Sequence, residues 1–270
     1  MQKLEFKFQY KNRSIPYDVW TTSSSAASTV LFLGTVQVGR ITEWVARLCP
    51  PRTIVVQGAP HWLANPDGSD TTDFVYRFGA DAISKLASRF SEKGITVIAD
   101  SQSAPFILKA ALKKEYAALI RRIILIQPLG MNMATYLSYQ PSSVALFQKR
   151  VSLNSLHQLP YFLTNKSLRY NYMQIYKLVA HNKQQVNAQY AAGLSHSALD
   201  DLMVARKRGI DVRIVCGEKD ALFPPKEIQK ALQTCGLGDI PILVVPKVPH
   251  SPLPTRQGKK LLKAALEQKR

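Results

Sequence analysis

The sequence lacks long hydrophobic runs and has few cysteines. No stretch approaches the roughly 18–20 consecutive apolar residues of a membrane-spanning helix, which argues against a transmembrane protein. The three cysteines, Cys49, Cys216 and Cys235, are odd in number and irregularly spaced. This pattern predicts neither a disulfide framework nor a cysteine metal site, so we expect reduced thiols that are buried or partly buried.

Acidic residues are scarce relative to basic ones. The chain has 18 Asp and Glu against 36 Lys and Arg, which gives a formal net charge of +18. Such a charge favours anionic partners, namely acidic substrates, phosphorylated carriers, membrane surfaces or nucleic acids. Because no zinc finger, RNP-type aromatic motif or other nucleic-acid module is present, we expect no specific nucleic-acid partner. A solvated basic surface without any partner explains the charge as well, and both interpretations stay open.

The N-terminus carries a strand pattern. Residues 1–8 alternate apolar and polar side chains, whereas a signal peptide needs a continuous apolar stretch. We therefore predict a cytoplasmic protein without a transmembrane segment, for which peripheral membrane contact is possible. The 270 residues, 46% of them hydrophobic, are enough for one sizeable core with an insertion.

Short apolar runs alternate with helical patterns along most of the chain. This alternation predicts an α/β fold with a mostly parallel sheet flanked by helices. The expected strands are residues 4–10, 15–21, 29–33, 53–57, 95–99, 122–126, 212–216 and 242–245. The expected helices are residues 41–48, 74–93, 225–234, 257–268 and the stretch that follows Ser103.

The alternation breaks in one segment, which predicts an inserted helical lid over residues 131–205. Residues 1–130 and 206–270 then form the core. The lid segment has no clear strand and holds seven of the eleven tyrosines. Between Met131 and Leu199 it has Lys and Arg side chains but no Asp or Glu, so a basic, tyrosine-rich lid could attract an anionic substrate. Tyrosines that pack the lid onto the sheet, with lysines facing water, are the alternative.

Three strand ends carry side chains that suit nucleophilic catalysis. The first strand enters the small-residue cluster Ser101-Gln102-Ser103-Ala104-Pro105, from which a helical pattern leaves. Asp220 follows a second strand in Gly217-Glu218-Lys219-Asp220, and His250 follows the last strand. The order Ser, Asp, His, with each residue after a strand, is a hydrolase layout.

These features resemble the α/β-hydrolase family over nearly the whole chain. The resemblance implies Ser103 as the nucleophile, His250 as the general base and Asp220 as the acid that orients the histidine. It also implies an oxyanion hole from the backbone N–H of Ala104 and that of Thr35, with Val36 as the alternative donor.

Some positions depart from the family pattern. Pro105 stands where the family has a small residue, usually glycine, and Leu33-Gly34 stands where it often has His-Gly. Among other titratable residues, Asp100 is interpreted as structural, Glu218 is a second choice for the acid, and His61 could face the pocket.

The resemblance implies a serine hydrolase that cleaves a carboxylic ester or thioester through an acyl-enzyme, with no metal or organic cofactor. An acyltransferase on the same three residues is an alternative, because an acyl-enzyme can pass its acyl group to an alcohol or amine. A non-catalytic binding protein on a hydrolase fold is the other, since fold alone does not prove activity.

Overall fold

The fold is described from a computed structural model of the chain. The structure describes residues 1–22, 27–34, 40–59, 71–87, 94–131, 198–250, 253 and 255–267, together with Arg150, Asn154 and a few other single residues up to 181.

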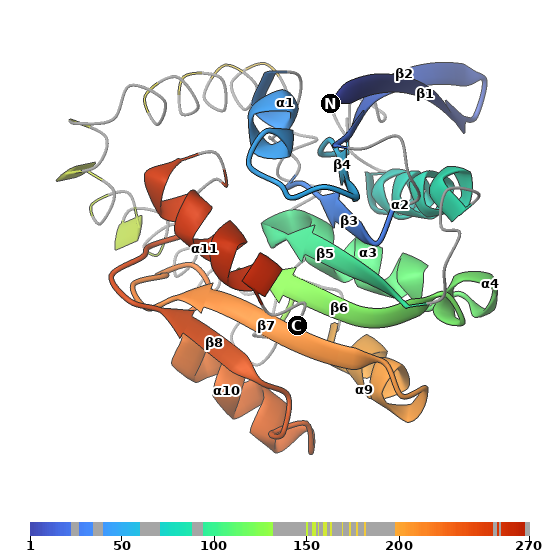
Figure 1. The fold of residues 1–270 in the computed structure, drawn as a ribbon. Helices are drawn as coiled ribbons and strands as arrows, with labels where there is room; N and C mark the ends of the chain where they lie inside the picture. Colours follow the sequence, from blue (N-terminus) through green and yellow to red (C-terminus); the bar gives the residue numbers. More distant parts are fainter. Residues whose placement is uncertain are drawn as a thin grey trace.

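The centre of the molecule is an eight-stranded sheet in the order β1-β2-β4-β3-β5-β6-β7-β8 (Figure 1). The first two strands pair as an antiparallel hairpin, β2 also runs antiparallel to β4, and all other neighbours are parallel. The strands are β1 (Gln2–Tyr10), β2 (Arg13–Thr21), β3 (Thr29–Phe32), β4 (Thr53–Val56), β5 (Ile95–Asp100), β6 (Ile120–Ile126), β7 (Asp211–Gly217) and β8 (Ile242–Val245).

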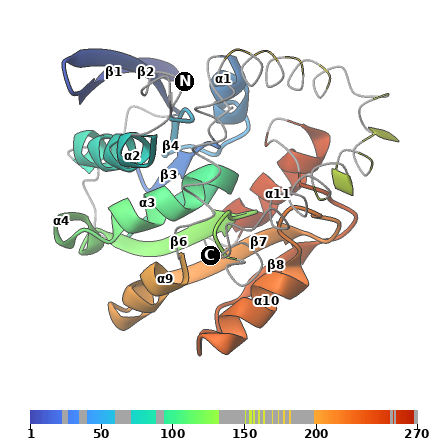
Figure 2. The ribbon, with the colours of Figure 1, turned by 180° about the vertical axis from the view of Figure 1, so that it is seen from behind.

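Helices cover both faces of the sheet, as the two opposite views show (Figures 1 and 2). Helices α1 and α11 lie on one face, and α2, α3, α9 and α10 lie on the other. The helices are α1 (Arg40–Ala46), α2 (Thr71–Ala87), α3 (Ala104–Ala111), α4 (Lys114–Ala117), α9 (Ala198–Lys207), α10 (Pro225–Thr234) and α11 (Arg256–Glu267).

The central strands are mostly apolar because both of their faces are buried. Along β3, Val30 and Phe32 belong to the larger core cluster under α2 and α3, whereas Leu31 belongs to the cluster under α1 and α11. Successive side chains of a strand point to opposite faces, so a strand covered on both sides needs apolar residues at every position. The fully buried β3, β4 and β5 therefore form a rigid support for the loops at their carboxyl ends.

The predicted fold class is confirmed, and each predicted strand is present. Helix α10 and strand β8 have the predicted bounds, and α2 begins at Thr71, earlier than predicted. The lid predicted for residues 131–205 lies mostly outside the described residues, so its extent stays a prediction. The residues of that range from Ala198 onward are described. They belong to α9, which contacts α3 and β7. No helix in the described part of the chain is long and apolar enough to cross a membrane.

Candidate active site

Ser101 occupies a sharp turn between β5 and α3. Strand β5 ends at Asp100, and Ser101 begins a single turn of 3-10 helix that leads directly into α3. The φ angle of Ser101 is +51°, in the left-handed region that non-glycine residues seldom adopt. The carbonyl of Ser101 accepts hydrogen bonds from the N–H groups of Leu129 and Ala104, so both neighbouring segments hold this strained residue in place. Its side chain is only partly buried and stays accessible.

The serine hydroxyl next to His250 belongs to Ser101, which corrects the expectation for Ser103. The Oγ atom of Ser101 lies 3.1 Å from His250 Nε2. Ser103 is 8% exposed, and its Oγ lies 2.9 Å from the carbonyl oxygen of Asp100 and 3.2 Å from that of Phe32. The same oxygen accepts the backbone N–H of Asp100 at 3.1 Å, which completes a reciprocal capping box with the Asp100 side chain. Ser103 therefore fixes the turn and does not face the histidine.

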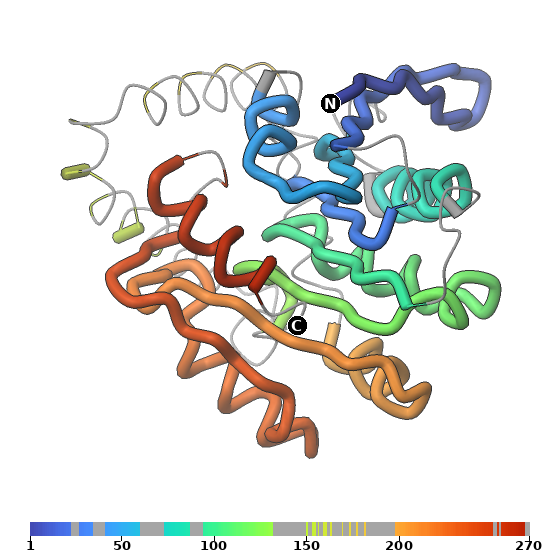
Figure 3. The backbone as a smooth tube through the Cα atoms, viewed as in Figure 1, coloured from blue at the N-terminus to red at the C-terminus, as the bar shows by residue number. Residues whose placement is uncertain are grey.

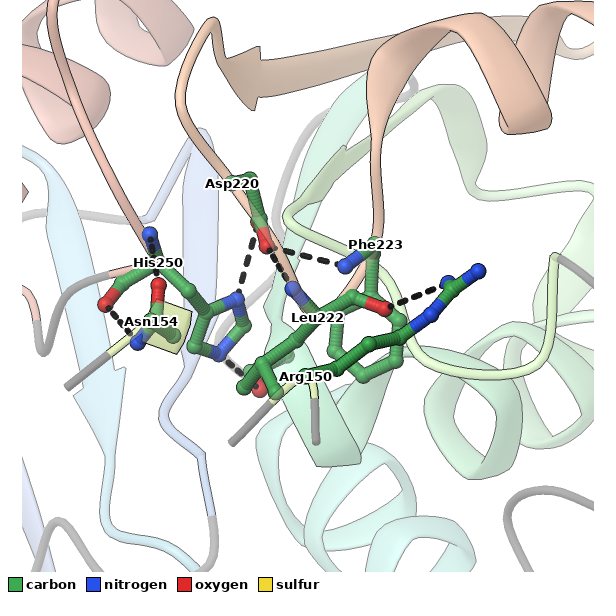
Figure 4. Close-up of polar contacts among 7 residues, drawn as sticks. Arg150, Asn154, Asp220, Leu222, Phe223 and His250 are labelled. Carbon is green, nitrogen blue, oxygen red and sulfur yellow. Dashed lines mark hydrogen bonds and ion pairs between the residues drawn. The ribbon is translucent and has the colours of Figure 1, made fainter. Parts of the chain in front are cut away.

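Asp220 is a buried carboxylate with partners on both oxygens. Its Oδ1 accepts the backbone N–H groups of Leu222 and Phe223, each at 2.9 Å. Its Oδ2 lies 2.9 Å from Nδ1 of His250 (Figure 4). Because the two backbone donors fix the carboxylate from one side, the remaining oxygen is aimed at the imidazole.

His250 lies between the acid and Ser101. A carboxylate can only accept hydrogen bonds, so the ring carries its proton on Nδ1 and presents an acceptor at Nε2. Phe223 packs edge-on against the ring at 5.2 Å between centroids. Burial alone would lower the pKa of His250, but the charge of Asp220, its hydrogen bond to the ring and the charge of Asp100 together raise the pKa above its ordinary value.

A glycine allows the loops of the acid and the base to meet. A Cβ atom on Gly217, the last residue of β7, would lie 2.2 Å from the backbone oxygen of Val248. That oxygen accepts the N–H of Lys219 at 2.9 Å, and the N–H of Glu218 bonds the carbonyl of Val245. Figure 3 shows the chain passing from β7 through α10 and β8 into α11 along one side of the molecule. The two loops thus form one hydrogen-bonded unit at the carboxyl edge of the sheet.

Two residues that the sequence did not single out contact these loops. Asn154 donates from Nδ2 to the carbonyl of His250 at 3.1 Å and accepts the N–H of His250 at 3.0 Å (Figure 4). Arg150 donates to the carbonyl of Leu222 at 3.4 Å and to Glu227 at 2.6 Å. Asn and Arg are common surface residues, and no spacing in the sequence distinguished these two.

The predicted oxyanion donors have different outcomes. The N–H of Ala104 already bonds the carbonyl of Ser101 inside the 3-10 turn, so Ala104 is not available to a substrate oxygen. The expectation for Ala104 followed from Ser103 as the nucleophile, whereas the hydroxyl beside His250 belongs to Ser101. Thr35 and Val36 lie outside the described residues, as does His61, and their roles stay predictions.

The other titratable residues near the site are accounted for. Glu218 accepts the N–H of Lys247 at 2.8 Å and is exposed, whereas Asp220 holds the histidine. Burial and the charge of Asp220 raise the pKa of the Cys216 thiol well above its ordinary value, so Cys216 is a protonated core residue. Among the described residues no group of three or more His, Cys, Asp or Glu side chains could hold a metal ion.

A signal for Ser101 is present in the sequence. The family pattern requires small residues two positions before and two positions after the nucleophile. Around Ser101 these are Ala99 and Ser103, whereas around Ser103 one of them is Pro105. Pro105 departs from the pattern when Ser103 is taken as the nucleophile. With Ser101 as the nucleophile, Pro105 lies outside the pattern and fits the first turn of α3.

Comparisons with solved structures identify the fold. A serine hydrolase from Cycloclasticus zankles is 10% identical, with 99% of this chain and 96% of that chain covered at a TM-score of 0.62. The 2-hydroxy-6-oxo-6-phenylhexa-2,4-dienoate hydrolase from Rhodococcus sp. strain RHA1 is 12% identical, with 99% and 98% covered at 0.61. A thioesterase domain from the curacin biosynthetic pathway is 12% identical, with 100% and 98% covered at 0.55.

The protein has the α/β-hydrolase fold, as these similarities over nearly the whole chain show. No protein-family profile matches the sequence, and no curated protein matches it either. The function of this chain therefore has to be argued from its own site.

Proposed function

We propose that the protein is a serine hydrolase that cleaves a carboxylic ester or thioester through an acyl-enzyme. The observation that carries the proposal is the chain of hydrogen bonds from Ser101 to His250 to Asp220, with distances of 3.1 and 2.9 Å. These three residue types in this geometry constitute a nucleophile, a general base and an orienting acid. Their position at the carboxyl ends of the strands is where open α/β sheets bind ligands.

Each side chain has one task in the proposed reaction. His250 Nε2 removes the proton of Ser101 as Oγ forms a bond to the acyl carbon, and the same proton then goes to the leaving alcohol or thiol. Asp220 holds the proton on Nδ1 and stabilises the imidazolium that forms. A water molecule activated by the same histidine then hydrolyses the acyl-enzyme. The carboxylic acid product leaves, and the Ser101 hydroxyl is restored.

The oxyanion hole follows from the corrected nucleophile. The residue after Ser101 is Gln102, and its N–H belongs to the first turn of a helical segment, where backbone N–H groups have no partner within the helix. We therefore assign the first oxyanion donor to Gln102. The second donor remains the N–H of Thr35, after β3.

An acyltransferase on the same three residues is the alternative within this class, and a binding protein without activity is the alternative outside it. The strained φ of Ser101 favours an enzyme over a binding protein. Backbone strain of this kind costs roughly 1–3 kcal/mol and persists where the surroundings enforce it, typically at active sites.

A fluorophosphonate probe tests the central proposal. We expect the folded wild-type protein to react covalently at one serine and to hydrolyse p-nitrophenyl acetate or butyrate, because the probe requires an activated serine next to a base. Mass spectrometry of the labelled protein and release of p-nitrophenolate are the measurements. A well-folded protein that neither reacts with the probe nor releases p-nitrophenolate would support the binding protein instead.

The charge of the chain supports an anionic acyl substrate. Six Lys and Arg side chains and no Asp or Glu lie between residues 131 and 199. Described members of this segment also expose apolar side chains, with Leu156 and Leu163 each 64% exposed. A basic and apolar surface suits a substrate with an acyl chain and a negative charge, or peripheral contact with an anionic membrane.

Ionic strength tests this steering. We expect kcat/KM for an anionic ester to fall several-fold when salt is raised from about 0.01 M to 0.5 M, because exposed charges are screened as the Debye length shrinks. An uncharged ester of the same acyl chain is the control and should change little. A kcat/KM that is independent of salt for the anionic ester would remove the steering proposal and leave the reaction class untouched.

A further inference from the structure

We propose that Asn154 is a positioning residue for His250, the candidate catalytic base, because it bonds both the backbone N–H and the backbone carbonyl of that residue. Arg150 supports the same geometry by contacting the loop that carries Asp220. The proposal rests on the proposed hydrolase function, and it makes the segment that follows β6 part of the catalytic geometry.

Asn154 binds His250 in a way that fixes orientation. Its side-chain amide donates to the carbonyl and accepts the N–H of the same residue, at 3.1 and 3.0 Å. These two groups belong to the peptide planes on either side of the His250 Cα, so the two hydrogen bonds together restrict the backbone torsions of His250, whereas a single bond would act as a pivot. Asn154 is 6% exposed, so water competes poorly for these bonds. The amide therefore acts through the backbone that carries the imidazole.

Arg150 makes the corresponding contact on the acid side. It lies four residues before Asn154, and both residues have helical conformation. Its side chain is 12% exposed and contacts the carbonyl of Leu222 and the carboxylate of Glu227. Leu222 supplies one of the two N–H groups that hold Asp220, so the arginine braces the loop that fixes the acid. Both bonds of the triad thus depend on loops that this one segment touches (Figure 4).

Position matters here because His250 lies in a loop beyond the sheet. It follows the short edge strand β8, which pairs only with β7 within the described sheet. Displacement of a catalytic group by about 1 Å can cost about a hundredfold in rate. A residue that fixes the backbone of the base should therefore affect the chemical step more than substrate binding.

The test compares Asn154→Ala with Gln233→Ala. We expect Asn154→Ala to lower kcat for p-nitrophenyl acetate and the rate constant of fluorophosphonate labelling by about ten- to hundredfold, with KM within about twofold. We also expect the acidic limb of the pH profile to move to lower pH, because a displaced imidazole loses part of its hydrogen bond with Asp220. Gln233→Ala removes an exposed side-chain amide on α10, away from the site, and should behave as wild type.

Several results would overturn the proposal. One is a kcat and labelling rate within twofold of wild type. Another is a lower fraction of active protein with an unchanged rate constant and pH midpoint, which is the behaviour of a residue that only supports folding. Should Asn154→Ala melt well below wild type, Asn154→Asp keeps the bond from the N–H of His250 and removes the other. The criteria for this variant are kcat and the labelling rate alone, because a new carboxylate charge by itself raises the pKa of His250.

We call the two Asn154 hydrogen bonds to the His250 backbone the clamp. The failure of the clamp proposal and the failure of the hydrolase proposal are distinguishable. NMR titration of the His250 imidazole needs no turnover. We expect a lower pKa in Asn154→Ala than in wild type even if no ester is hydrolysed. Identical titration curves in the two proteins would contradict the clamp, whereas a wild type without labelling or turnover contradicts the hydrolase alone.

Discussion

Replacing Ser101 with alanine is expected to abolish fluorophosphonate labelling and to lower kcat/KM for a p-nitrophenyl ester by roughly four to six orders of magnitude, the effect seen when a triad nucleophile is lost. The reason is geometric, because Ser101 carries the hydroxyl 3.1 Å from the imidazole. Labelling stoichiometry by mass spectrometry and steady-state kinetics measure the effect. The melting temperature should change little, since the lost hydroxyl lies at a partly exposed position.

The matched control is Ser103→Ala, two residues further on. This change leaves the Ser101 hydroxyl in place, so labelling should persist and kcat/KM should stay within roughly tenfold of wild type. Its effect should appear in stability, because the buried N–H of Asp100 loses its acceptor, at a cost of about 1–3 kcal/mol. The opposite result, with labelling lost in Ser103→Ala and retained in Ser101→Ala, would restore the serine expected from the sequence and contradict the geometry of the site.

Replacing Asp220 with asparagine is expected to lower kcat by about four orders of magnitude and to shift the pH profile. An asparagine can still accept the two backbone N–H groups at Oδ1. It then turns an amide NH2 toward His250 Nδ1, which favours the tautomer with the proton on Nε2 and removes the acceptor that Ser101 needs. The loss of kcat therefore comes from the wrong tautomer, in a fold that should remain intact.

The shift of the pH profile has a definite sign. In wild type the base must be neutral, so kcat/KM rises as His250 loses its proton, and the raised pKa places that midpoint above about 6.5. Asp220→Asn removes a charge that raises the pKa while burial continues to lower it, so the midpoint of the residual activity should fall below that of wild type. The pH dependence of kcat/KM for both proteins is the measurement. A midpoint that stays unchanged or rises would show that Asp220 does not act on the titrating group.

The architecture could be predicted because the buried strands leave little ambiguity. Runs such as Ile54, Val55 and Val56 are apolar on both faces since helices cover both sides of the sheet, and the turns between the runs carry their own signals. The first residue of α2 was harder to predict, because helix ends vary by one or two residues and the sequence marks them weakly.

Asp220 and His250 could be predicted because each follows its strand at the place that the family pattern gives it, with Glu218 as the second choice for the acid. Two serines compete two positions apart at the end of β5, and the strand continues to Asp100, one residue beyond the prediction. That single residue decides which hydroxyl meets the turn and which one is buried against Phe32. Asn154 could not be predicted, because its partners are backbone groups, which leave no trace in the sequence.

The close approach of Gly217 to Val248 sets a limit on how this scaffold can diversify. Because a single methyl group has no room there, the acid and base loops must be inherited as one matched piece, and neither can lengthen or tilt alone. New specificities would then have to arise outside these two loops. The relative position of Asp220 and His250 is thereby set by one point of backbone packing.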